Sequence, residues 1–534
     1  LVPTYNTDPE YLQECIESVL AQSYENWELC IADDSSTDKR VRSVVKQYSA
    51  TDKRIKYTFR KINGHICEAT NSALELASGA YIALLDHDDI IWPNALFEVV
   101  KVINVHKDAK FIYTDEDKIQ EDGKHADPFF KPDWSPEFLR SINYITHFSI
   151  IDRKLVNKVG GFRKGYEGAQ DWDLFLRVSR ETDKIFHIPK VLYSWRMSEN
   201  STAKKPSSKD YAYINQKKAL RDDINSRNLQ AGLDWQIPFS MWRVSYKLKE
   251  KSLVSIIIPT KNQFEIIKQC LESIRDKTTY KNYEVVIVDT GSTEDQVWSL
   301  YDDAKKYLNK VRIVKYEGVF NFSSACDLGA KSADGEYLLF LNNDTEVITP
   351  TWIEDMLGYA QQKDIGAVGC KLFYPDRKIQ HAGIILGVGG QSGTPGIAGH
   401  FFPAYVDAPP QDPAQLLYAG GTRNFTAVTA ACVMVAKDKF KKVKGFDPKF
   451  QIAFNDVDLC LKLLNNGWRN VYLPHVNLYH HESISVGQPG SKQRDLTVFA
   501  KEIDTMLTKW GKLIENDPYF HPEFRRDIAN ARLK

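Results

Sequence analysis

The sequence lacks the features that would assign it to membranes, to nucleic acid or to a disulfide-bonded class. No apolar run approaches the ~20 residues that a membrane-spanning helix needs. The 70 acidic residues cancel the 70 basic ones, so net charge gives no reason to expect a nucleic-acid partner. The apolar and charged fractions, 43% and 26%, are those of an ordinary globular protein.

Cysteine pairs and phosphate-binding glycine motifs are also missing. The eight cysteines are scattered without a C-x-x-C pair and mostly lie in apolar runs, which favours buried free thiols in a reducing compartment over disulfides. The stretch "GVGGQSGTPG" (387–396) lacks the order of a dinucleotide fingerprint, and no G-x-x-x-x-G-K-[ST] occurs. The histidines show no zinc-ligand spacing. The chain opens "LVPTYN" without Met, which we interpret as a truncated sequence.

A long internal repeat organises the chain. Three motifs recur 256 residues apart, namely "VPTYN" as "IPTKN", "NWELCIADDSST" as "NYEVVIVDTGST", and "ASGAYIALLDHD" as "ADGEYLLFLNND". Further on, "GAQDWDLFLRV" (168–178) recurs as "AFNDVDLCLKL" (453–463), now 285 residues apart. The second copy therefore holds 29 extra residues (285 less 256), which we expect in the Gly/Pro-rich stretch 387–413. A period this long indicates two homologous domains rather than a solenoid.

Each copy has the pattern of an α/β domain. "VSIIIPT" (254–260) is a continuous apolar run, as expected of a parallel strand covered on both faces. In the first copy, one helix face is formed by Leu12, Cys15, Ile16, Val19 and Leu20. Such alternation predicts a Rossmann-like, mostly parallel sheet in each copy, with ligands beyond the carboxyl ends of its strands. We expect an N-terminal domain at 1–205, a helical linker at 206–250, a C-terminal domain at 251–493 and a helical tail at 494–534.

Paired carboxylates follow one buried strand. Asp86 and Asp88 come at the end of "YIALLD", and oxygen ligands suit Mg²⁺ and Mn²⁺. Such a pair fills part of a coordination shell and leaves room for a diphosphate. The alternative is a polar turn before the next helix, where acids also favour the N-terminus. The buried strand and the repeat favour the metal site.

Other polar residues also lie at strand ends. Asp33 and Asp289 could accept a ring N–H from a nucleobase, or could form an Asx turn or N-cap. Arg196 and His481 lie just past a strand, where they could meet a phosphate or be surface charges.

A third acidic position begins a helix in each copy. At a helix N-terminus Asp171 and Asp456 would tend to stay ionised, which suits a general base. Either one could instead be an N-cap, and the nearby Asp173 and Asp458 could serve equally.

These motifs together resemble family 2 glycosyltransferases of the inverting GT-A type, present twice. The first copy carries "VPTYN…ADDSSTD…LLDHDD…GAQDWDLFLR", and the second carries "IPTKN…VDTGSTED…FLNNDTEV…AFNDVDLCLK…HHES". More narrowly, "YTDEDKI", "FKPDWSPEFL", "NYITHFSI" and "YEGAQDWDL" resemble tandem enzymes that assemble bacterial O-antigen, capsule or related surface glycans.

The resemblance implies a role for each position. Asp171 and Asp456 would be the catalytic bases. A divalent cation, Mn²⁺ or Mg²⁺, would be held by Asp86 and Asp88 in the first copy and by Asp344 in the second. Donor binding would involve Pro3, Tyr5, Asp33, Asp86, Arg196, Pro259, Asp289, Asn343 and His481. The partners would be UDP- or dTDP-sugars and a glycan or lipid-linked acceptor, on the cytoplasmic face of the cell membrane, which the chain would meet through a partner or its basic, aromatic tail.

Two departures from the family pattern bear on activity. Gln170 and Asn455 replace the Glu that many relatives carry before the base, which removes a charge but not the base. The second metal motif reads Asn342-Asn343-Asp344, with one carboxylate fewer, so metal affinity is expected to be weaker there.

Three hypotheses remain open. The first, which we expect, is a bifunctional transferase with two active sites of different specificity, and the second is one catalytic domain with a binding or scaffolding copy. The third, a nucleotidyltransferase on a related fold, is disfavoured because "VPTYNTD" and "IPTKNQF" lack the Gly-rich loop usual after the first strand of such enzymes.

Overall fold

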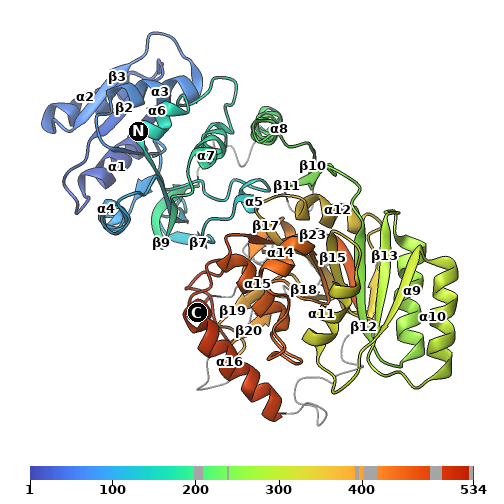
Figure 1. Ribbon diagram of the computed structural model, residues 1–534. Coiled ribbons are helices and arrows are strands. Elements are labelled where there is room, and N and C mark those ends of the chain that lie inside the picture. The colour runs from blue at the N-terminus through green and yellow to red at the C-terminus, as the bar shows by residue number, and fades with distance from the viewer. Residues whose placement is uncertain (198–208, 237–239, 391–395, 402–417, 482–495, 528–532) are drawn as a thin grey trace. The chain divides into compact units, whose positions relative to one another are not determined.

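The computed structural model describes residues 1–197, 209–236, 240–390, 396–401, 418–481, 496–527 and 533–534. These residues form two compact units (Figure 1). Unit 1 comprises Leu1–Trp134 and Asn143–Leu233, and unit 2 comprises Ser135–Ile142 and Asp234–Lys534. The junctions expected at 205/206 and 493/494 lie outside the described residues.

Unit 1 contains a parallel sheet of order β1-β2-β3 and a second sheet of order β4-β8-β6-β9-β5, with β7 on β6. Its strands are β1 (Val2–Thr4), β2 (Leu29–Asp33), β3 (Ile55–Phe59), β4 (Tyr81–Ala83), β5 (Ile90–Ile91), β6 (Phe111–Ile119), β7 (His125–Phe129), β8 (Ser149–Asp152) and β9 (Ile185–Arg196). Its helices are α1 (Pro9–Leu20), α2 (Lys39–Thr51), α3 (His65–Leu76), α4 (Ala95–Val105), α6 (Arg153–Lys158), α7 (Gln170–Glu181) and α8 (Lys209–Ser226).

Unit 2 is built on one large sheet of order β14-β13-β12-β15-β22-β17-β23-β16, with β18 on β17 and β21 on β23. The strands are β12 (Val254–Thr260), β13 (Tyr283–Asp289), β14 (Lys310–Lys315), β15 (Tyr337–Leu341), β16 (Thr345–Val347), β17 (Ile365–Phe373), β18 (Ile379–His381), β21 (Arg423–Phe425), β22 (Cys432–Ala436) and β23 (Arg469–His480). Two separate pairs are β10 (Ala231–Gln236), which begins within the last residues of unit 1, with β11 (Met241–Tyr246), and β19 (Ile384–Leu386) with β20 (Ala398–His400). The helices are α5 (Pro136–Leu139), α9 (Phe264–Lys277), α10 (Asp295–Tyr307), α11 (Phe322–Ser332), α12 (Trp352–Ala360), α14 (Lys437–Lys442), α15 (Asn455–Asn465) and α16 (Leu496–Glu515).

The sequence repeat is also a repeat of topology. The order β4-β8-β6-β9-β5 in unit 1 corresponds to β15-β22-β17-β23-β16 in unit 2, with the same strand directions at each step. The predicted α/β class is confirmed. The first half of each sheet is parallel as predicted, whereas the second half is mixed because β8 and β22 run antiparallel to both of their neighbours.

The predicted core elements form as their patterns require. Every residue of β12 is buried, as expected of an apolar strand with helices on both faces. Helix α1 begins after an Asp8 cap and buries Leu12, Cys15, Ile16 and Val19, so the predicted face is confirmed. All eight cysteines are buried free thiols, as the sequence predicts.

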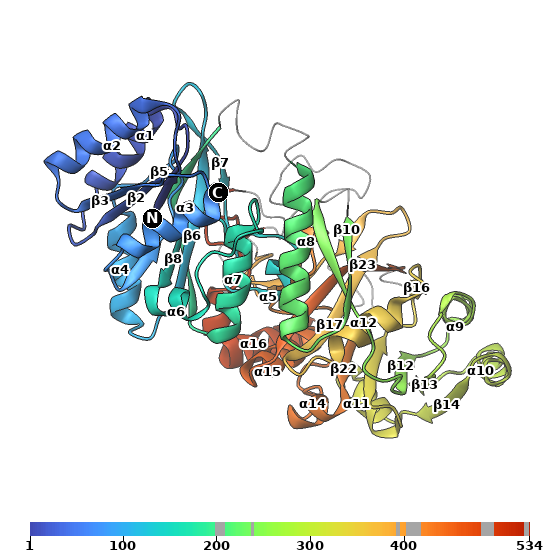
Figure 2. The same cartoon turned by 90° about the horizontal axis from the view of Figure 1, so that it is seen from above.

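The helices at the expected linker and tail each pack beside a domain. Helix α8 lies next to α7 within unit 1 (Figure 2), and α16 contacts β19 and α15 within unit 2. Each helix follows the equivalent strand of its copy, β9 or β23. The two helices therefore hold corresponding positions in the repeat.

One short segment of the first sequence copy packs into unit 2. Helix α5 places Glu137 against Arg469, with oxygen to nitrogen distances of 3.0 and 3.1 Å, and Ser135 Oγ donates to Asn424 at 2.9 Å. Burial would raise the pKa of Glu137, but Arg469 lowers it to about 2.

Two further expectations concern the extra residues of the second copy and membrane-spanning helices. Of the stretch 387–413, where the 29 extra residues are expected, 391–395 and 402–413 lie outside the described residues. Within the part of the chain that the structure describes, no helix is long and apolar enough to span a bilayer.

Candidate active sites

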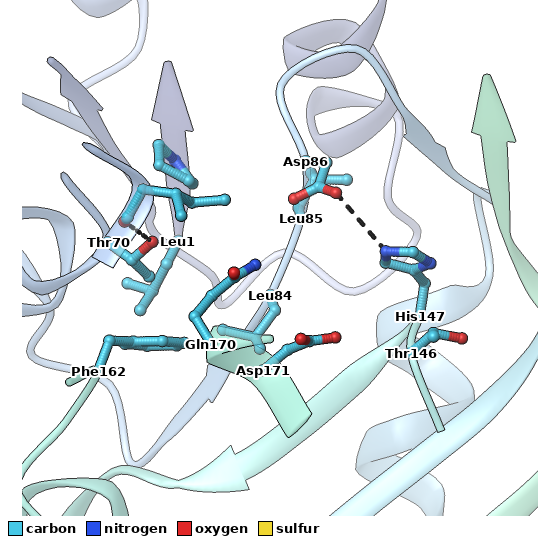
Figure 3. Close-up of a pocket in the computed structure, with 12 residues that line it drawn as sticks. Leu1, Thr70, Leu84, Leu85, Asp86, Thr146, His147, Phe162, Gln170 and Asp171 are labelled. Atoms are coloured by element: carbon cyan, nitrogen blue, oxygen red, sulfur yellow. Dashed lines mark hydrogen bonds and ion pairs between the residues drawn. The ribbon is translucent and has the colours of Figure 1, made fainter. Parts of the chain in front are cut away.

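A pocket in unit 1 brings together two carboxylates that the sequence assigns to different roles. Asp86, in the turn after β4, and Asp171, in the first turn of α7, both line it (Figure 3). The pocket has a volume of about 50 Å³, and its other lining residues include Pro3, Ile66, Thr146, His147 and Gln170. The predicted base and one predicted metal ligand therefore meet at one site.

His147 lies between two carboxylates at this pocket. Its Nε2 is 3.5 Å from Oδ2 of Asp86, and its Nδ1 is 3.5 Å from Oε2 of Glu116. Burial would lower the pKa of His147, but the two carboxylates raise it well above its ordinary value. Desolvation would likewise raise the pKa of Asp86, but the charged ring lowers it. Asp86 and His147 therefore form an ion pair just beyond the carboxyl end of β4 (Figure 3).

The rest of the acidic turn is fixed by Arg196, at the end of β9. Its Nε donates to the Asp88 carbonyl and its backbone N–H donates to Asp89 Oδ1, both at 2.7 Å. The Asp88 side chain remains 30% exposed. Arg196 is thus part of the strand-end turn and only 10% exposed, rather than an isolated surface charge, and its contact with a phosphate stays a prediction.

Asp171 faces the pocket, whereas its neighbour Asp173 does not. Asn143 Nδ2 donates to Asp171 Oδ2 at 2.8 Å, and burial raises the pKa of Asp171. Asp173 is fully buried and accepts from Arg163 and from Arg177, the latter at 2.7 and 2.9 Å. Helix α7 is capped by neither side chain. Of the two acids that the sequence left open, Asp171 is the one available to a substrate.

Of the residues predicted to contact the nucleotide in unit 1, some line the pocket and others do not. Pro3 lines the pocket, whereas Tyr5 is exposed and Asp33 is buried outside its lining. Asp33 Oδ2 accepts from Arg42 at 2.8 Å and both its oxygens accept weakly from the Ser36 amide at 3.3 Å. The Ser36 amide is three residues on from Asp33 and helix α2 is capped by Asp38, so Asp33 forms neither the Asx turn nor the N-cap that the sequence offered as alternatives.

A second pocket, in unit 2, is built on equivalent positions. The register of β4 with β8 and of β15 with β22 aligns Ile150 with Met434, and the offsets of 256 and 285 align the flanking motifs. On this basis six positions line both pockets, namely Ile66 and Phe322, Asp86 and Asn342, Thr146 and Ala430, His147 and Ala431, Gln170 and Asn455, and Asp171 and Asp456. The second pocket is larger, with a volume of about 490 Å³.

Asp456 occupies the place of Asp171. Its Oδ2 accepts from the Ala430 amide at 3.1 Å and its Oδ1 accepts from the Val457 amide at 2.8 Å. The alternative acid Asp458 is fully buried, where it accepts from Lys509 Nζ at 2.6 Å and Trp510 Nε1 at 2.8 Å. Both copies thus direct the same one of two acids toward the pocket.

The second metal motif uses a histidine from another strand. Asp344 Oδ1 lies 3.1 Å from His480 Nε2, and His480 lines the pocket although Asp344 does not. Burial would raise the pKa of Asp344, but His480 lowers it. Asn343 is buried, and its side-chain amide donates to Thr260 Oγ1 at 3.0 Å, at the carboxyl end of β12. The His481 backbone N–H donates to the Asp344 carbonyl at 2.9 Å, as the Arg196 side chain does to Asp88.

The remaining predicted residues of unit 2 lie at the ends of β12 and β13. Asp289 accepts from the Gly291 and Ser292 amides at 3.0 and 2.9 Å and from Tyr301 Oη at 2.9 Å. Pro259 lies in β12 beside Val288 of β13. Neither residue lines the second pocket.

Sequence reasoning missed the two histidines. His147 reaches Asp86 from the segment before β8, and His480 reaches Asp344 from the end of β23. The partners are 61 and 136 residues apart (147 less 86, 480 less 344), so no local spacing could reveal them. The fold alone brings each histidine to its acid.

The donor atoms present fit a divalent cation. Asp86, Asp89 and His147 offer ligand atoms that all lie within 4.8 Å of one another. In unit 2, Asp344 and the Asn342 amide lie 3.1 and 3.3 Å from the same His480 nitrogen. Carboxylate oxygens suit Mg²⁺ and Mn²⁺, and His147 could add a ring nitrogen only after losing the proton that its two carboxylates favour.

Comparison with known proteins gives the family. Residues 1–160 and 255–385 match the family model for glycosyl transferase family 2. An uncharacterized protein of Sinorhizobium fredii is 43% identical over 98% of this chain and 57% of its own length, and an O-antigen biosynthesis protein of Myxococcus xanthus is 33% identical over 100% and 41%. The chain thus spans about half the length of these relatives.

More distant likenesses cover part of the chain. The chondroitin synthase of Pasteurella multocida is 32% identical over 38% of this chain and 21% of its own length. The solved structure of a mannosyltransferase from Pyrobaculum calidifontis, in complex with GDP-Man and Mn²⁺, is 16% identical with a TM-score of 0.36, covering 51% of this chain and 68% of that one. The two matched segments begin the two sequence copies, and the chain belongs to glycosyl transferase family 2.

Proposed function

We propose that the chain is a bifunctional inverting glycosyltransferase that adds sugars from UDP- or dTDP-linked donors to a growing bacterial surface glycan. One observation carries this proposal. In both pockets a helix-start aspartate lines the same cavity as the first residue of the strand-end motif, Asp86 or Asn342, at equivalent positions of the repeat. The similarity to an O-antigen biosynthesis protein supports the glycan class.

In this mechanism Asp171 and Asp456 act as general bases. Each carboxylate takes the proton of an acceptor hydroxyl as that oxygen bonds to the anomeric carbon of the donor sugar. The bond from this carbon to the diphosphate breaks on the opposite face, and the nucleoside diphosphate leaves. Burial raises the pKa of Asp171, which makes it a stronger base than an exposed aspartate.

The strand-end groups hold the leaving group. Asp86 and Asp88 in unit 1, and Asp344 in unit 2, would bind a divalent cation, which when bound neutralises charge on the diphosphate. His147 and His480 keep their partner carboxylates ionised and oriented, because each lies at ion-pair distance from one of them. Asp33 and Asp289 would contact the base of the donor.

The test is a pair of isosteric variants of the full chain. Asp171→Asn and Asp456→Asn should each abolish one transfer to a glycan primer in a screen of UDP- and dTDP-sugars with Mn²⁺. Both variants should still bind donor, because neither aspartate is assigned to it. Matched controls are Asp183→Asn and Asp302→Asn, whose side chains are 88% and 72% exposed. Full retention of both transfers in the two site variants would refute the assignment of the bases.

The alternative, one catalytic unit with a scaffolding copy, is supported by the missing carboxylate at Asn342. It predicts that Asp456→Asn leaves every transfer intact while Asp171→Asn abolishes all of them. Separate acceptors for the two transfers distinguish these outcomes.

A further inference from the structure

The two pockets differ most in their aromatic content. Phe322 and Phe454 line the second pocket where Ile66 and Ala169 stand in the first copy. Phe320, 38% exposed, corresponds to Gly64. A Cβ at Gly64 would lie 2.6 Å from Arg60 Nη2 and 2.8 Å from Glu68 Cβ, so unit 1 leaves little room for a ring there. The aromatic wall is thus specific to unit 2.

The wall is completed by Phe499 of α16. The rings of Phe454 and Phe499 stack with their centroids 5.7 Å apart and planes 21° apart, and both line the pocket. The loop that carries Phe454 is held by Glu502, also on α16, which accepts from the Ile452 amide at 2.8 Å and the Ala453 amide at 3.2 Å. Helix α16 therefore builds one side of the pocket.

A second loop contributes Phe320 and Phe322 to the pocket lining. The Phe320 carbonyl accepts from Gln451 Nε2 at 2.7 Å, and the Phe322 amide donates to the Gln451 carbonyl at 2.9 Å. Gln451 precedes Phe454 by three residues, so the two aromatic loops are hydrogen-bonded to each other. The rings are fixed before any ligand arrives, which lowers the entropy lost on binding.

The aromatic wall and Asp456 line the same pocket, and this determines what the pocket can hold. Four phenylalanines line a pocket of about 490 Å³, which lies within the range of small-molecule sites, roughly 300–1,000 Å³. A pyranose ring presents an apolar C–H face and a rim of hydroxyl groups. The face matches an aromatic ring and a rim hydroxyl matches a carboxylate acceptor. Asp456 disfavours an anionic ligand here, because it is the one carboxylate among the described residues that line the pocket.

We propose that the second pocket is an acceptor subsite that binds a pyranose by its apolar face against Phe454 and Phe499, with a hydroxyl directed at Asp456. The first pocket has about a tenth of the volume and Ile66 at the position of Phe322, and Phe162 is the one phenylalanine among the described residues that line it, so it lacks the stacked pair of rings. This inference rests on the proposed function, because it names the acceptor class of the second transfer.

The test measures sugar binding directly. Saturation-transfer NMR on the full chain, with methyl β-D-glucopyranoside, methyl β-D-galactopyranoside and methyl α-L-rhamnopyranoside as probes, should show contact with ring C–H protons. Phe454→Leu and Phe499→Leu keep an apolar side chain and should weaken the best probe roughly two- to tenfold. Phe97→Leu, at a phenylalanine that is 52% exposed in unit 1, is the matched control and should change nothing.

A kinetic measurement separates this inference from the proposed function. Phe499→Leu should raise the acceptor KM of the second transfer and leave its donor KM and the whole first transfer unchanged. Absence of ring-proton contacts, or equal binding by wild type and both variants, would overturn the subsite. Probe binding that the variants weaken, in a protein without any transfer activity, would keep the subsite and overturn the proposed function instead.

Discussion

Replacement of Glu502 by alanine should impair the second transfer although this residue touches no substrate. Its carboxylate is 1% exposed and accepts two backbone N–H groups of the loop that leads into α15. Asp456 lies three residues beyond that loop's Ala453. Loss of the carboxylate frees the loop to move, and the base with it.

The magnitude follows from those two hydrogen bonds. Each buried donor left unpaired costs about 1–3 kcal/mol, and because Ile452 and Ala453 are half-buried, water can reach them, so we expect the lower end, about 2 kcal/mol in total. A displacement of the base by about 1 Å can cost roughly 100-fold in rate. The kcat of the second transfer should therefore fall by about 10- to 100-fold.

The assay is steady-state kinetics of each transfer beside thermal unfolding. Glu502→Gln keeps an oxygen acceptor and should recover most of the lost kcat, and Lys501→Ala, at an exposed residue of the same helix, should have no effect. In unit 1, Asn215→Ala removes one hydrogen bond of 2.8 Å from α8 to the Glu167 carbonyl and should lower only the first transfer. A lower unfolding temperature in Glu502→Ala with an unchanged second transfer would refute a positioning role.

Three further predictions concern the sites themselves. The first transfer, isolated in the Asp456→Asn variant, should slow as the pH falls through a pKa above the ordinary aspartate value of 3.8. The reason is that burial raises the pKa of Asp171 and a protonated carboxyl group cannot serve as base. A pH–rate profile whose acid limb has a pKa of 3.8 or below would contradict this. His147→Ala and His480→Ala should each weaken Mn²⁺ binding in their own unit by about 10- to 100-fold in calorimetric titration, because each removes the group that orients a carboxylate. If either single variant weakened Mn²⁺ binding equally in both units, two separate sites would be excluded. Tyr301→Phe removes a buried hydrogen bond to Asp289 and should destabilise unit 2 by about 1 kcal/mol in thermal unfolding, with no change in the first transfer.

Local patterns predicted the strands and the residues at their ends. The apolar run of β12 and the helix face of α1 needed only burial and periodicity, and the repeat offset located Asp171 and Asp456 together. The local pattern left open which of two nearby acids lines a pocket. In the structure Asp171 and Asp456 line the pockets, whereas Asp173 is hydrogen-bonded by arginines and Asp458 by Lys509 and Trp510.

Contacts between distant segments could not be predicted. His147 and His480 reach their acids across the antiparallel strand pairs β4–β8 and β16–β23, whose register is set by tertiary packing, and no short spacing encodes it. Helix α16 was predicted as a helical tail, yet its polar Glu502 is buried against the loop before α15. Segment 135–142 likewise belongs to unit 2 because Glu137 finds Arg469 there, a partner 332 residues away.

The most direct measurement is a crystal structure of the full chain with donor nucleotide-sugar and Mn²⁺. The account predicts two manganese peaks in anomalous density, one beside Asp86 and Asp88 and one beside Asp344, each bridging to diphosphate oxygens, with Asp171 and Asp456 near the anomeric carbons. Manganese and diphosphate bound away from these acids in both units would contradict it.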